Sequence, residues 1–192
     1  IAIVGLAMLA FILGDFLNSG SSFFNRSREN VGVIEGQKVH YTEYEAAKDQ
    51  LTEVYKIESG RTDFDEDTYA QIRNQVWNMF VMDYTLRAQA KEIGMDITAD
   101  ELTELCVGNN VHQILRGRRA FMDENGQFSR EAVKNMINAI NEGSEDAEQN
   151  ANLQQAKTYW LYWEKAVRIS YMQEKYTNLL QHLFRANSLD AE

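Results

Sequence analysis

The chain of 192 residues carries 29 acidic against 19 basic side chains, which gives a formal net charge of -10 at pH 7. This charge argues against nucleic acid as a partner and against a protein that lies flat on anionic lipid. Both nucleic acid and anionic lipid are negatively charged and repel an acidic protein. The single cysteine, Cys106, rules out a disulfide within the chain and is expected to be buried, and the absence of proline predicts long unbroken helices.

Residues 1–17 are apolar or glycine apart from one ionisable side chain, Asp15. A helix of this length covers roughly 25 Å at about 1.5 Å per residue, slightly less than the hydrocarbon core of a bilayer at about 30 Å. The stretch has no polar face before Asp15, unlike a core helix, and no small-residue cleavage site, unlike a signal peptide. We therefore expect a transmembrane helix over residues 1–17 that extends upstream of Ile1.

Small side chains lie on one face of this expected membrane helix, at Ala7, Ala10 and Gly14. Small residues let a second membrane helix approach closely, so this face is a candidate for membrane helix packing. Glycine and alanine are also common in membrane helices that have no partner, and both interpretations stay open.

A polar, serine-containing connector at residues 18–30 precedes two short β-prone runs within residues 31–41. Gly36 supplies the positive φ that a tight turn needs, so the two runs are expected to pair as a small hairpin. Thr42 and Glu45 have the spacing of a capping box, which predicts Thr42 as the N-cap of a helix that ends near Gly60.

Apolar residues at three- and four-residue spacing predict four further helices, over 63–94, from Thr98 onward, over 129–143 and over 144–185. Thr98 and Glu101 repeat the capping-box spacing, and Ser129 is placed to cap the helix that follows it. The last helix carries two apolar stripes in succession, which predicts that it packs on one body first and on another further along. The stripes are Leu153, Ala156, Trp160, Trp163 and Val167, and then Ile169, Met172, Tyr176, Leu179 and Leu183.

Two features between these helices have ordinary explanations. The basic cluster of Arg116, Arg118 and Arg119 predicts a solvated or acid-paired surface in a chain of this charge. Residues 123–126 begin like a calcium loop, but Phe128 stands where that loop requires glycine, so a plain turn is expected.

Three stretches together resemble the SurA/PpiD family of periplasmic folding chaperones. They are the strand-turn-strand-helix run at 31–47, the long helix closed by glycine and followed by a capped helix at 76–105, and FMDENGQFSREAVKNMI at 121–137. Glu35 departs from the asparagine that the family usually has before this glycine, which affects only the turn type.

The resemblance implies a mainly α protein, in which an N-terminal transmembrane helix is followed by an elongated, SurA-N-like helical domain with one small β-hairpin. The implied division is an anchor at 1–17, a linker at 18–30, a chaperone domain at 31–187, and a linker towards a downstream domain at 188–192. It also implies a single-pass protein of the bacterial inner membrane with its body in the periplasm. The expected partners are unfolded polypeptide clients, membrane lipid and the membrane helices of the Sec translocon.

The sequence offers no nucleophile-base pair, metal-spaced cluster or phosphate loop, so no catalytic residue, metal or cofactor is assigned. Family members usually carry a parvulin-type prolyl isomerase domain downstream. The three histidines here, His40, His112 and His182, lie on separate expected elements without parvulin-like surroundings. An isomerase acting through a domain outside these residues is therefore one alternative function, and a structural or docking subunit of an inner-membrane assembly is another.

Methionine and aromatic side chains instead provide the adaptable apolar surface that a binder of unrelated unfolded chains needs. Their spacing is also that of core residues, but Tyr159, Trp160 and Tyr162 cannot share one helical face, so some are expected to be exposed in a groove. The candidate peptide-binding residues are Trp77, Met82, Tyr159, Trp160, Tyr162 and Trp163.

Overall fold

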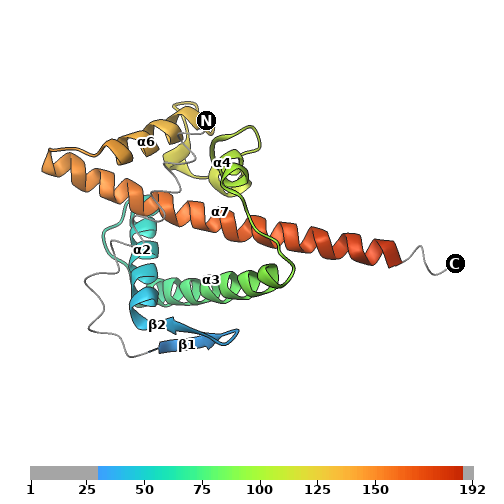
Figure 1. Ribbon diagram of the computed structural model, residues 1–192. Coiled ribbons are helices and arrows are strands. Elements are labelled where there is room, and N and C mark those ends of the chain that lie inside the picture. Colours follow the sequence, from blue (N-terminus) through green and yellow to red (C-terminus); the bar gives the residue numbers. More distant parts are fainter. Residues whose placement is uncertain (1–29, 188–192) are drawn as a thin grey trace.

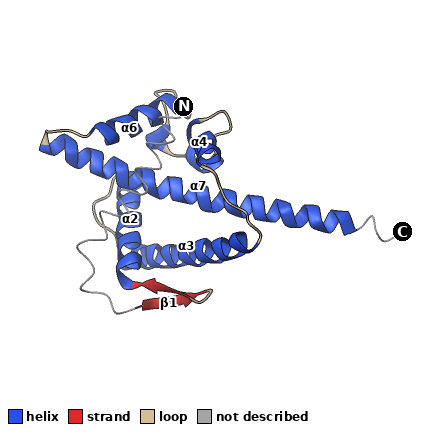
Figure 2. Ribbon diagram, in the orientation of Figure 1, coloured by secondary structure: helices blue, strands red, loops and turns tan. Residues whose placement is uncertain are grey.

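The computed structural model describes residues 30–187, which form one small hairpin and a set of helices (Figure 1). In chain order the elements are β1 (Asn30–Ile34), β2 (Gln37–His40), α2 (Tyr41–Ser59), α3 (Glu66–Glu92), α4 (Ala99–Val107), α5 (Gln113–Arg116), the short 3-10 helix η1 (Arg119–Phe121), α6 (Arg130–Glu142) and α7 (Ala147–Asn187). Helix dominates and the hairpin lies at one edge (Figure 2). The prediction of a mainly α fold with one small hairpin is confirmed for this part of the chain.

The expected membrane helix at 1–17, with its small residues Ala7, Ala10 and Gly14, lies outside the described residues. Across residues 30–187, none of the helices combines the length and the apolar character needed to cross a bilayer.

Helix α7 is the axis of the fold. Its 41 residues extend about 60 Å at about 1.5 Å per residue. Helices α2 and α3 pack on one side of it, and α4, α5 and α6 pack on the other (Figure 1). Its buried side chains lie between Tyr159 and Met172. The hydrophobic core is therefore assembled around the middle of this helix.

The hairpin packs one face on the helices. Its strands pair antiparallel, and the connecting residues Glu35 and Gly36 both have positive φ, 49° and 73°, as a type I′ turn requires. The prediction of a tight turn at Gly36 is confirmed. Val39 is fully buried, and a Cβ on Gly32 would clash with a ring carbon of Trp77, so the Trp77 indole lies directly on β1.

The predicted cap of α2 is wrong. The helix begins at Tyr41, with His40 in the N-cap position and no side-chain cap hydrogen bond. Strand β2 runs to His40, which still pairs with Asn30, so the chain enters the helix without a connecting residue. Thr42 consequently lies inside the first turn, where its hydroxyl cannot act as the N-cap.

The predicted caps of α4 and α6 are confirmed. Thr98 Oγ1 accepts a hydrogen bond from the Glu101 N–H at 3.1 Å, and Glu101 Oε2 accepts one from the Thr98 N–H at 2.9 Å, which completes the capping box. The Ser129 hydroxyl accepts a hydrogen bond from the Ala132 N–H at 3.1 Å. These local hydrogen bonds fix where α4 and α6 start.

The loop before α6 is a plain turn, as predicted. Asp123 Oδ1 accepts hydrogen bonds from the N–H groups of Asn125 and Gln127, both at 2.9 Å. Its carboxylate is thus used to hold the loop closed.

Candidate functional site

The predicted peptide-binding residues fall into two groups. Trp77 is half-buried and Met82 is exposed, both on α3. The other four, Tyr159, Trp160, Tyr162 and Trp163, are buried on α7.

The expectation that part of the α7 group is exposed is therefore wrong for Tyr159, Trp160 and Tyr162. Trp160 retains only 1% of its accessible surface. Helix α7 is covered from two sides, by α2 and α3 and by α5 and α6, so side chains on different faces of it are buried together. Peptide binding by the six residues stays a prediction, and of this set Met82 is the one exposed to solvent.

The buried aromatic rings on α7 pack against Phe121 of η1 and against one another. Phe121 meets Tyr159 with ring centroids 5.4 Å apart and Trp160 at 5.8 Å, and Tyr162 meets Trp163 at 4.9 Å, all edge to face. Such pairs add about 0.5–1.5 kcal/mol each beyond the area they bury. The aromatic richness of α7 thus stabilises the fold.

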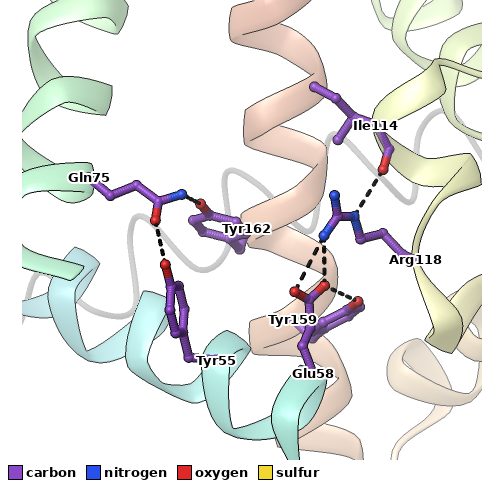
Figure 3. Close-up of polar contacts among 7 residues, drawn as sticks. All are labelled: Tyr55, Glu58, Gln75, Ile114, Arg118, Tyr159 and Tyr162. Carbon is purple, nitrogen blue, oxygen red and sulfur yellow. Dashed lines mark hydrogen bonds and ion pairs between the residues drawn. The ribbon is translucent and has the colours of Figure 1, made fainter. Parts of the chain in front are cut away.

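A polar junction borders these rings where α2, α7 and the α5–η1 segment meet (Figure 3). The Glu58 carboxylate accepts hydrogen bonds from Arg118 Nη1 at 3.0 and 3.3 Å and from the Tyr159 hydroxyl at 3.1 Å. Arg118 Nε donates to the Ile114 carbonyl at 3.1 Å, and the Arg118 guanidinium carbon lies 3.9 Å from the centre of the Trp163 ring. One guanidinium therefore ties three elements together, and the prediction of acid pairing within the basic cluster is confirmed for Arg118.

Gln75 of α3 extends the junction to two further tyrosines. Its Oε1 accepts a hydrogen bond from the Tyr55 hydroxyl at 2.9 Å, and its Nε2 donates to the Tyr162 hydroxyl oxygen at 3.4 Å (Figure 3). Burial is the main cause that raises the pKa of Tyr162 to about 12, and it also raises the pKa of Tyr159. Both phenols are neutral at physiological pH and act here as hydrogen-bonding groups.

An ionised group, Asp83, is also buried where α3 packs on α7. Asp83 accepts a hydrogen bond from Arg87 Nε at 2.7 Å and lies 3.9 Å from Lys165 Nζ. Burial lowers the pKa of Lys165, against the opposing effect of Asp83. At the preceding position on α7, burial raises the pKa of Glu164 to about 7. The Asp83 carboxylate is thus neutralised by Arg87 and Lys165, and the three side chains form a packed ion cluster.

The remaining reactive side-chain types serve the fold as well. Cys106 is buried, as predicted, and burial raises the pKa of its thiol. His112 Nδ1 accepts a hydrogen bond from the Ile114 N–H at 3.2 Å, and its Nε2 lies 3.2 Å from Glu174 Oε1. Within residues 30–187, no group of three or more histidine, cysteine, aspartate or glutamate side chains could hold a metal ion.

Several large apolar side chains in the described part of the chain are exposed to solvent. They lie on β1, on the solvent side of α3 and on the far end of α7, which Figure 1 shows projecting past the end of α3. Met82 was among the binding residues predicted from the sequence, whereas the strand was not, because all its larger residues are apolar and do not indicate which face is buried. The clearest members are Val31, Val33, Val81, Met82, Leu179, Leu180 and Leu183.

A family model described as the SurA-like N-terminal domain matches residues 1–137. The match covers well over half of the chain. The chain belongs to the SurA-like N-terminal domain family. The SurA-like match includes the hairpin and helices α2 to α5, and it ends within α6, before the axial helix α7. Neither a curated protein nor a solved structure matches the chain. Membership in this SurA-like family indicates a protein of the chaperone type.

Proposed function

We propose that this SurA-like domain is the periplasmic body of a PpiD-type chaperone, anchored in the bacterial inner membrane by residues 1–17. The observation that carries the proposal is the family match, which includes the apolar N-terminal stretch together with the hairpin and helices α2 to α5. The protein would hold unfolded or newly translocated polypeptides near the Sec translocon. Its partners would be these clients, the lipid around the anchor and the membrane helices of the translocon.

Dispersed apolar exposure supports this function. Val33, Met82 and Leu183 are exposed on three separate elements rather than gathered in one closed site. Separate, shallow contacts suit a binder that must accept unrelated sequences with modest affinity. A membrane leash compensates for that weakness, because it raises the effective concentration of the surface where clients emerge.

Site-specific photocrosslinking in the intact protein tests the proposal. A photoreactive residue at position 82 is expected to capture many unrelated unfolded proteins during translocation. The matched control is Asn78, an exposed polar residue one turn earlier on α3, where few captures are expected. Capture of a single stable partner from position 82 would contradict client binding.

A docking subunit is the second candidate, and the projecting end of α7 favours it. Leu179, Leu180 and Leu183 are exposed there within about one and a half helical turns. Crosslinks from Leu183 to one membrane protein, with none to unfolded chains from Met82, would support docking instead. A parvulin-type domain elsewhere in the full-length protein would add isomerase activity, which a prolyl-isomerisation assay of that protein measures.

A further inference from the structure

The two edges of the hairpin can be told apart from its register. A two-residue turn closes the ladder, so Ile34 and Gln37 form a hydrogen-bonded pair. Such pairs alternate with pairs that make no mutual hydrogen bonds, and the next pair along is Val33 opposite Lys38. The backbone N–H and C=O of Val33 therefore point to the outer edge of β1, and those of Lys38 point to the outer edge of β2.

These outer edges differ in how well they are protected. The sheet has two strands, and no other strand within residues 30–187 pairs with either edge. Strand β2 presents Lys38, and a lysine on an edge strand deters the addition of another strand. Strand β1 has no charged residue, and its Val33 side chain is 62% exposed, the highest value among the large apolar residues of this part of the chain. Among the residues that the structure describes, 30–187, nothing pairs with the β1 edge or protects it with a charge.

The hairpin is held in place from its other face. Ile34 and Val39 are buried, and the Trp77 ring lies on Gly32. Because the strand is already fixed in place, it loses little further conformational entropy when a ligand binds to its edge. An extra residue in β1 between Asn30 and Gly32 makes a bulge that bends the strand, so the straight edge is short and the contact is correspondingly weak.

We propose that the outer edge of β1 binds an extended segment of unfolded polypeptide as a third strand, through the backbone N–H and C=O of Val33. The chemistry of the edge defines this ligand, since an extended main chain is what offers N–H and C=O groups at strand spacing. Main-chain pairing does not depend on the ligand's sequence, and the exposed Val33 side chain adds an apolar contact. This inference rests on the proposed function, because it names how the domain holds an unfolded chain.

Paired proline substitutions in the full chain, reconstituted in nanodiscs, test the edge. Val33→Pro removes the outward N–H and leaves the ladder to β2 intact, and Lys38→Pro makes the same change on the other edge. The probe is a fluorescent peptide of alternating valine and threonine, and its anisotropy measures binding. Val33→Pro is expected to weaken binding at least about tenfold, while Lys38→Pro leaves it unchanged.

Amide hydrogen exchange in the unsubstituted protein gives a second measurement that requires no variant. The peptide is expected to slow exchange at the Val33 N–H and to leave the Lys38 N–H unaffected. Equal binding by both proline variants, with unchanged exchange at Val33, overturns the inference. Loss of self-association in Val33→Pro, without loss of peptide binding, also overturns it, because the edge then serves a second copy of the chain.

The same data separate this inference from the proposed function. If position 82 captures unfolded clients but the peptide does not bind the β1 edge, the inference alone fails. If the intact protein captures no client from position 82 and binds no peptide, both fail.

Discussion

Two stretches of α7 have similar apolar patterns in the sequence, but one is buried in the fold and the other is exposed to solvent. In residues 159–172, Trp160 and Val167 are fully buried, because other helices close around α7 from both sides. In residues 176–183, Leu179 and Leu183 are exposed, where α7 continues past the end of α3 (Figure 1). Periodic spacing thus predicts a helix and its apolar face, whereas the neighbouring elements decide whether that face is covered.

The largest expected effect comes from truncating one apolar residue in each stretch. Trp160→Ala is expected to lower the free energy of unfolding by about 3–5 kcal/mol, because it leaves a large cavity in the core. Leu183→Ala, at a side chain 57% exposed, is expected to change it by no more than about 0.5 kcal/mol. Urea unfolding followed by far-UV circular dichroism measures both. Similar losses from the two variants would show that the end of α7 is covered in solution.

A pH-dependent effect of intermediate size is expected from Glu164, in the buried stretch. Its pKa of about 7 in the folded protein exceeds the value of about 4.3 for an exposed glutamate. Between these values the folded state keeps a proton that the unfolded chain has lost. Stability therefore falls as pH rises from about 4 to 7, by up to about 4 kcal/mol, and this group causes no further change above that range.

Glu164→Gln is expected to abolish that decline and to be more stable than the unsubstituted protein at pH 8, with the difference shrinking towards pH 5. Urea midpoints between pH 5 and 8 measure it. The control is Glu148→Gln, on an exposed turn near the start of α7, which should leave the pH profile unchanged. Parallel profiles for the Glu164 variant and the unsubstituted protein would contradict a buried, protonated carboxyl.

The smallest effect concerns the boundary between the two stretches. Glu101, held by the Thr98 capping box, also pairs with Lys175 of α7 at 2.9 Å, just before the exposed end begins. Thr98→Ala is expected to cost about 1 kcal/mol, which corresponds to a fall of roughly 2–4 °C in Tm. Thr42→Ala removes no cap and is the matched control. Differential scanning calorimetry compares them, and an equal fall in Tm for both would refute the assignment of the caps.

Features governed by neighbouring residues were predictable from the sequence. The turn at Gly36, the capping box at Thr98, the cap at Ser129 and the helix end at Gly60 each depend on hydrogen bonds or φ values within a few residues. Thr42 failed as a cap because its geometry depends on where β2 ends, which the local pattern does not contain.

Features governed by distant residues were not predictable. Glu58 and Arg118 meet across 60 residues of sequence, so the basic cluster indicated an acidic partner for Arg118 but not which residue it would be. The burial of Tyr159 and Tyr162 follows from helices that arrive from both sides of α7. The open edge of β1 depends on the register of the hairpin and on the contact between Gly32 and the Trp77 ring of α3.

The contact between Trp77 and Gly32 gives the protein a built-in optical reporter. Trp160 and Trp163 are embedded in the core, so their emission responds only when the helical body opens. Detachment of the hairpin would hydrate the Trp77 indole alone and move its fluorescence to longer wavelength. A red shift that precedes the loss of helical signal would therefore time the release of this strand pair as a separate, local opening.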